Sequence, residues 1–86
     1  MQWTVVVEKR AYRTLSRLEE ADRQRIQGAL DAMRATPFGG DLKHLSNDPR
    51  GQFRRRVGSW RIFFDVDRGS GRVDVTAIER RTSTTY

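Results

Sequence analysis

The sequence contains no cysteine and only two prolines among its 86 residues. Without cysteine the chain has neither disulfide bonds nor thiolate metal ligands, which fits a reducing cytoplasm. The opening residues, MQWTVVVEKR, lack the long apolar stretch of a signal peptide, and no run approaches the length of a membrane span. We therefore expect a cytoplasmic protein that does not associate with a membrane.

The sequence is also poor in the residues that usually catalyse hydrolysis. It has a single histidine, His44, no His/Cys/Asp cluster with metal-ligand spacing, and no Gly-rich phosphate loop before a helix. A lone histidine in a stretch such as LKHL more often makes a loop or core contact than acts as a catalyst. We expect no metal, no cofactor and no metal-dependent hydrolysis.

Positive charge is abundant, and nearly all of it comes from arginine. Lys and Arg total 17 against 11 acidic residues, the net charge is +6, and 15 of the 17 cations are arginine. The guanidinium group matches phosphate geometry and stacks on bases. A basic balance indicates an anionic partner, most often a nucleic acid, although arginines that are merely solvated are the alternative. The positions of the arginines along the chain must decide between these two interpretations.

The apolar pattern predicts one strand and then two helices. Residues 2–7 are β-branched and apolar, as in a strand, and residues 8–18 carry apolar side chains at helical spacing. Asp22 is a plausible N-cap for a second helix, which the sequence TPFGG at 36–40 ends. The apolar stripe of this second helix comprises Ile26, Ala29, Leu30 and Met33.

Beyond residue 52 the apolar period changes from helical to alternating. This change predicts a meander of strands over 53–57, 60–67 and 72–78. Leu42 and Leu45 are expected to pin the long connection that precedes it. The order β-α-α-β-β-β predicts a single α+β domain over residues 1–86, with an antiparallel sheet and two helices packed on one face.

Alternation of side chains places several arginines on the face of the sheet that the helices leave bare. Arg54 and Arg56 share one face of their strand, and Arg61 lies on the same face of the next strand. Like charges this close repel, and the only acid that the pattern places nearby is Asp65. We interpret the three arginines as an anion site, the alternative being a charged face that only improves solubility. Arg55 falls on the helix side and is expected to reach past an edge.

The C-terminal end of the last strand returns toward Arg61. Arg80 or Arg81 is therefore expected to extend the anion site. The polar tail that ends in Tyr86 either folds over the same surface or forms a disordered chain end.

Two segments of the chain resemble a known family. The segment GQFRRRVGSWRIFFDVD, residues 51–67, resembles the central signature of the RelE/ParE toxin superfamily. The ending AIERR with a terminal tyrosine resembles the close of the RelE branch. The order of the elements and the LKHL lead-in are also similar, so the resemblance covers nearly the whole chain.

The resemblance implies a toxin of a type II toxin–antitoxin module that cleaves messenger RNA in the ribosomal A site. It implies metal-independent cleavage assisted by the 2′-hydroxyl of the RNA, an acidic RelB-like antitoxin, and binding to the ribosome with its mRNA and rRNA. Arg61 matches the arginine that stabilises charge on the scissile phosphate, and Tyr86 matches a tyrosine that stacks on a base or takes a proton. Arg80 or Arg81 matches a C-terminal arginine that acts as acid or charge stabiliser. The residues assigned to RNA phosphates are Arg54, Arg56 and Lys43.

Three departures from the family pattern limit this resemblance. Arg55 stands where the family has an apolar residue, Ser59 and Trp60 replace an Asp-Tyr pair, and arginines replace both lysines of the best-known RelE site. The superfamily also shares its scaffold among different targets. A ParE-like inhibitor of DNA gyrase without nuclease activity and a non-catalytic RNA-binding module therefore stay as alternatives.

Overall fold

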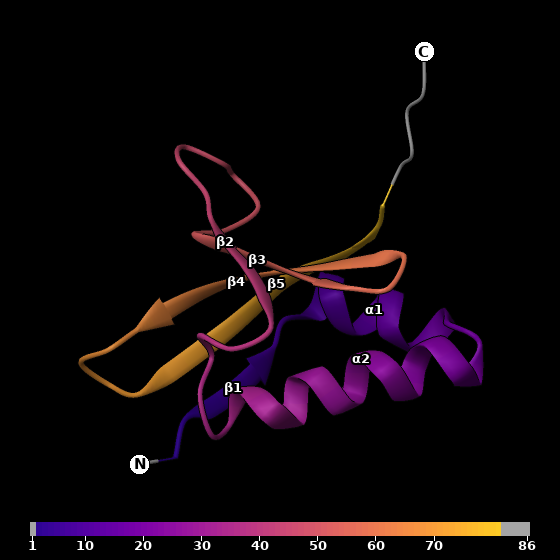
Figure 1. Ribbon diagram of the computed structural model, residues 1–86, viewed down its shortest axis with the longest axis horizontal. Coiled ribbons are helices and arrows are strands. Elements are labelled where there is room, and N and C mark those ends of the chain that lie inside the picture. The colour runs from indigo at the N-terminus through magenta and orange to yellow at the C-terminus, as the bar shows by residue number, and fades with distance from the viewer. Residues whose placement is uncertain (1, 82–86) are drawn as a thin grey trace.

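Two helices cover one face of a five-stranded sheet in the computed structural model, which describes residues 2–81 (Figure 1). The elements are β1 (Thr4–Val7), α1 (Lys9–Arg17), α2 (Glu20–Met33), β2 (Asp41–His44), β3 (Phe53–Val57), β4 (Trp60–Asp67) and β5 (Arg72–Arg80). The strand order is β1-β5-β4-β3-β2. The predicted α+β class, with both helices on one face, is confirmed.

The sheet differs from the prediction in two respects. The chain forms an additional strand, β2, where the sequence predicted a pinned connection, and β1 pairs with β5 in parallel rather than antiparallel. β2 has one half-buried residue, Leu42, among exposed ones, so its sequence carries little strand signal. β1 can run parallel to β5 because a long crossover that includes both helices separates them in the chain.

Helix α2 buries the predicted apolar stripe, but its N-cap is not the predicted residue. Ile26 and Met33 of α2 are fully buried, and Ala29 and Leu30 are nearly so. The N-cap residue of α2 is Glu19, and the predicted cap Asp22 lies in the first turn with Glu20. A carboxylate in the first turn is stabilised by the helix dipole, which accounts for an acid at this position without a capping role.

The core lies between the helices and the sheet. Strands β4 and β5 contribute its most buried side chains, which are Ile62, Phe64, Val73 and Val75. Phe53 of β3 stacks on Phe64 with ring centroids 5.6 Å apart. Most apolar side chains of the sheet lie on the helix side, and the opposite face carries mainly polar groups together with Phe63. Within residues 2–81, no helix is long and apolar enough to cross a membrane.

A β-bulge in β5 changes which side chains reach the bare face. Phe63 pairs with Ala77 and Phe64 pairs with Val75, so Thr76 is an extra residue without a partner in β4. The Thr76 hydroxyl donates a hydrogen bond to the Phe63 carbonyl oxygen at 3.1 Å. After the bulge Ile78 is the residue that enters the core, and Glu79 consequently lies on the bare face.

The loop between β2 and β3, residues 45–52, rises from the sheet on the side opposite the helices (Figure 1). Gln52 fixes the end of this loop to β4: its backbone N–H donates to Oδ1 of Asp65 at 2.8 Å, and its Oε1 accepts from the Val66 N–H at 3.0 Å. The Thr76 hydroxyl also donates to the Arg50 carbonyl oxygen. The loop is therefore tied to two strands and forms a wall beside the bare face.

Candidate functional site

A pocket of about 340 Å³ lies on the bare face of the sheet, beside the 45–52 loop. We call it the arginine pocket; it is lined by Lys43, Leu45, Asp48, Arg50, Arg54, Arg56, Arg61 and Phe63. The structure thus brings together Arg54, Arg56 and Arg61, as the alternation of side chains predicted, and Lys43, which was assigned with them to RNA phosphates, lies in the same lining. The volume is in the range of ligand-binding pockets, about 300–1,000 Å³.

The arginines of the pocket face one another across the β3–β4 hairpin. Arg56 is paired directly with Arg61, and Arg54 is only 9% exposed. The Nε atoms of Arg56 and Arg61 are both buried and have no hydrogen-bond partner among the described residues. Like charges in directly opposed positions destabilise a sheet, and unsatisfied buried donors cost free energy unless an acceptor meets them. Both effects favour an anionic ligand at this pair.

More acids lie near the arginines than the sequence indicated. Asp65 was predicted as the only one, which is wrong: Oδ2 of Asp41 lies 3.6 Å from Nε of Arg56, Asp48 lines the pocket, and Glu79 is paired with Arg61. Strand β2, the 45–52 loop and the bulge bring these three acids to the bare face; the connection before β3 was predicted, whereas β2 and the bulge were not. The pocket lining still has five cations and a single carboxylate, that of Asp48.

Arg50 is a site residue that the sequence analysis missed. Its guanidinium forms an ion pair with Asp48, with Nη2–Oδ2 at 2.8 Å and Nε–Oδ1 at 3.0 Å, and lies over the Phe63 ring at 4.1 Å from the centroid. Hydrogen bonds from the Arg50 side chain, and then from its backbone, lower the pKa of Asp48 to about 2. Asp48 is therefore a carboxylate at neutral pH and a poor proton acceptor. The turn sequence NDPRG, in which an acid precedes an arginine by two residues, was the sequence signal that could have indicated this ion pair.

Replacing Asp48 by asparagine is expected to reduce the acid sensitivity of the fold. The pKa of Asp48 is about 2 in the folded protein against an ordinary value of 3.8, so the unfolded chain takes up the proton first. Its stabilising contribution is complete above pH 3.8 and is lost as the pH falls toward 2. Thermal unfolding measured at about pH 5 and about pH 2 should show a smaller loss of stability in the variant. An equal loss in both proteins would contradict the assignment.

The predicted C-terminal residues do not all lie near the arginine pocket. Arg80 lies over the Trp60 ring, 5.7 Å from its centroid, and lines a separate pocket with Arg17 and Asp22. The Arg81 backbone N–H donates to the Ser59 carbonyl oxygen, which continues the pairing of β5 beside β4. Tyr86 lies outside the described residues.

Comparison with solved structures identifies the fold. The chain aligns with the archaeal RelE–RelB complex from Pyrococcus horikoshii at a TM-score of 0.84 and 19% identity, covering 98% of this chain and 100% of that chain. The toxin–antitoxin complex RelBE2 from Mycobacterium tuberculosis gives 0.82 at 21% identity, with 94% and 100% covered. The isolated E. coli RelE toxin gives 0.77 at 15% identity, with 95% and 87% covered. The chain has the RelE fold.

No protein-family model matches the sequence, and no curated protein matches it either. The likeness is therefore carried by the three-dimensional arrangement, at 15–21% identity in these three comparisons. Arg55 lies in β3, between β2 and β4, and not on an edge strand. Its guanidinium packs against Gly40, where a Cβ atom would lie 2.6 Å from the Arg55 Nε.

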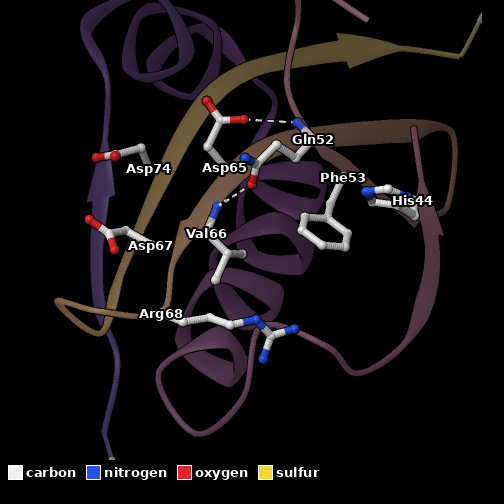
Figure 2. A pocket seen from close by; sticks show the side chains of 8 residues that line it. All are labelled: His44, Gln52, Phe53, Asp65, Val66, Asp67, Arg68 and Asp74. Carbon is white, nitrogen blue, oxygen red and sulfur yellow. Dashed lines mark hydrogen bonds between the residues drawn. The ribbon is translucent and has the colours of Figure 1, made fainter. Parts of the chain in front are cut away.

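A second pocket, larger than the arginine pocket, lies at the other end of the sheet and is mainly acidic (Figure 2). It measures about 720 Å³, and its lining includes Asp65, Asp67 and Asp74. Each carboxylate already has a local donor: the Gln52 N–H for Asp65, the turn N–H groups of residues 69 and 70 for Asp67, and Arg72 for Asp74. No group of metal-binding side chains occurs in the described part of the chain. The three carboxylates disfavour a phosphate in this pocket, where Arg68 is the one arginine of the lining.

His44 borders the acidic pocket rather than the arginine pocket (Figure 2). Its ring lies against that of Phe53, with centroids 5.1 Å apart. His44 is exposed and lies on β2, so its observed contact is this one with Phe53 and not a place in a loop or in the core.

Proposed function

We propose that the chain is the toxin of a type II toxin–antitoxin module and that it cleaves messenger RNA in the ribosomal A site. The observation that carries the proposal is the opposed pair of Arg56 and Arg61, whose buried Nε atoms have no hydrogen-bond partner among residues 2–81; the one carboxylate near either Nε, that of Asp41, lies 3.6 Å from the Nε of Arg56. The RelE fold supports it, since the proteins that share this fold include RelE toxins and RelB–RelE complexes.

In the proposed reaction, the RNA supplies its own nucleophile. The 2′-hydroxyl oxygen attacks the adjacent phosphorus, an O2′–P bond forms, and the P–O5′ bond breaks. One proton leaves the 2′-hydroxyl and another reaches the leaving 5′-oxygen, so the products are a 2′,3′-cyclic phosphate and a 5′-hydroxyl. Arg61 stabilises the extra negative charge of the intermediate phosphorane. Arg54, Arg56 and Lys43 hold neighbouring phosphates.

The proton carriers come from the C-terminal end of the chain. Asp48 is unsuited to this role because its pKa of about 2 makes it a weak base. Arginine releases protons reluctantly, and a tyrosine at its reference pKa of about 10 is mostly neutral at pH 7. Of the two C-terminal arginines, Arg81 suits the site better because Arg80 lies over Trp60. We assign Tyr86 to proton transfer or to stacking on a base.

Such a site should be slow on free RNA. It has an arginine-rich lining in place of a histidine pair or a metal, so it gains strongly from a partner that orients the substrate in line. Correct positioning can contribute about 7–11 kcal/mol to the lowering of the barrier. The ribosome is proposed as that partner.

A controlling antitoxin is the second proposed partner. The net charge of +6 and the basic bare face favour a small acidic protein that lays a helix or extended segment over this surface. Co-expression of an acidic protein encoded next to this chain should relieve growth arrest and should co-purify with it.

A translation assay tests the proposed activity. Translating ribosomes incubated with the protein should yield messenger fragments cut at A-site codons, with 5′-hydroxyl ends on the downstream pieces. Intact messenger together with blocked DNA supercoiling would instead support a gyrase inhibitor. RNA binding with neither effect would support a non-catalytic binding module.

Replacing Arg54 by glutamine is expected to weaken RNA binding and to flatten its salt dependence. Arg54 is 9% exposed in the arginine pocket, and glutamine keeps much of its packing while removing the charge. Each lost phosphate contact should reduce the slope of log K against log salt by about 0.7 for a single strand. Fluorescence anisotropy over a salt series measures this slope. Arg72→Gln, at the acidic end of the sheet, is the matched control, and equal slopes for Arg54→Gln and the parent would contradict a phosphate contact.

A further inference from the structure

Glu79 is the carboxylate placed to compete with RNA for Arg61. The β4–β5 register pairs Glu79 directly with Arg61. Side chains in such opposed positions have Cβ atoms about 4.5–5.5 Å apart, which is within reach of an ion pair. Yet no ion pair joins these two residues in the structure, although both belong to its described part.

The two oxygens of Glu79 are held by other arginines. Oε1 lies 2.9 Å from Nη1 of Arg50, and Oε2 lies 3.2 Å from Nη2 of Arg10. Arg50 belongs to the 45–52 loop, whereas Arg10 comes from α1, which packs along β5. The carboxylate is therefore held from two sides by cations that lie on different elements.

Arg50 is itself fixed in the orientation that this contact needs. Asp48 binds it through two of its guanidinium nitrogens, the Phe63 ring lies beneath it, and Thr76 holds its carbonyl oxygen. Thr76 is also the bulged residue, and the bulge places Glu79 on the bare face. The bulge therefore places the Glu79 carboxylate opposite Arg61, and the bulged residue Thr76 also anchors Arg50, which binds that carboxylate.

We propose that Arg50 and Arg10 act as a clamp that holds Glu79 away from Arg61, so that the Arg61 guanidinium stays available to an anionic ligand. Arg50 and Arg10 are positioning residues in this scheme, because they act on the ligand through Glu79. The consequence for RNA rests on the proposed function, whereas the position of the carboxylate does not.

The first test is a crystal structure of the Arg50→Ala variant. Without the clamp, the Glu79 carboxylate should turn to within about 4 Å of the Arg61 guanidinium, the limit for an ion pair. A Glu79 that keeps its position in this variant would overturn the proposal. Arg10 is 70% exposed and lies outside the arginine pocket, so Arg10→Ala releases Oε2 of Glu79 without touching the loop; Oε2 should then turn toward Arg61 while Oε1 stays with Arg50, and an unmoved carboxylate would count against the clamp.

The second test is a double-mutant cycle on RNA affinity, with a short 2′-O-methyl single-stranded RNA as an uncleavable probe. Arg50→Ala should weaken binding about tenfold, or about 1.4 kcal/mol. Glu79→Gln alone should change affinity by less than about twofold, because its charge is already neutralised by the clamp. In the Arg50→Ala background the same Glu79→Gln change should raise affinity by about threefold or more. Equal effects of Glu79→Gln in the two backgrounds would overturn the proposal, because Arg50 would then act only through its own charge.

A matched pair at the other end of the sheet controls for net charge. Arg72 binds Asp74 with Nε–Oδ1 at 2.7 Å, far from the arginine pocket. In a double-mutant cycle on this pair, the effects of Arg72→Ala and Asp74→Asn on RNA affinity should be additive. Failure of the parent protein to bind the probe would count against the proposed function alone, and the crystal structures would still decide the clamp.

Discussion

Replacing Arg61 by alanine is expected to lower messenger cleavage on translating ribosomes by about 10²–10³-fold, the usual effect of removing one preorganised donor from a charge-stabilising site. Arg61 lies opposite Arg56, and its buried Nε has no partner among the described residues, so its donors are free to meet charge that develops on phosphorus. The fold should survive, because removal of Arg61 also removes the repulsion between two opposed cations.

Two further variants distinguish a specific role of the Arg61 guanidinium from a general effect of positive charge on the protein. Arg61→Lys keeps the positive charge but loses the planar fork, so it should recover only part of the lost rate. Arg72→Ala removes one positive charge outside the arginine pocket and should cleave at the parental rate. Single-turnover cleavage rates, with thermal unfolding as a check on the fold, measure both effects. If Arg61→Ala cleaves as fast as the parent, the charge-stabilising role of Arg61 is wrong.

Deleting Tyr86 is expected to lower the cleavage rate by about 10²–10⁴-fold, the range for loss of one general acid or base. The expectation rests on the resemblance of the chain end to the close of the RelE branch and on the absence of another suitable base in the arginine pocket, whose one carboxylate has a pKa of about 2. A chain lacking Tyr86 should therefore bind ribosomes normally and cut slowly.

The variant Tyr86→Phe distinguishes the two roles that Tyr86 could have. Phenylalanine keeps the ring for stacking and lacks the hydroxyl that carries a proton. A rate as low as that of the deletion would assign proton transfer, and a parental rate would assign stacking. The control is Thr85→Ala, which changes the neighbouring residue and should leave the rate unchanged. A deletion variant with the parental rate would show that the terminal tyrosine has no part in cleavage.

The parts of the structure that the sequence predicted are those with a clear apolar period. The stripe of α2 and the limits of β3 and β4 were predicted correctly, because a buried face forces apolar residues to recur at the spacing of the element. The shared face of Arg54, Arg56 and Arg61 followed from the same alternation, together with a short turn that fixes the register of the hairpin. Here the local pattern and the tertiary structure agree.

The parts that the sequence did not predict depend on tertiary contacts. β2 is short, with Leu42 as its half-buried residue, and it is a strand because β3 provides its hydrogen bonds. The bulge at Thr76 decides the faces of all later residues in β5, and its one trace in the sequence is that Ile78 is out of phase with Val73 and Val75. Simple alternation from Val75 would have placed Arg80 on the bare face and Glu79 in the core. The bulge therefore explains why Glu79 was missed and why Arg80 lies over Trp60.

The attachment of the 45–52 loop has a consequence for ligand affinity. Gln52 joins the loop to β4 through both its backbone and its side chain (Figure 2). Thr76 joins it to β5. The wall that carries Arg50 is therefore in place before any ligand arrives. Binding to such a surface loses little conformational entropy, so more of the favourable electrostatic energy is retained as net affinity.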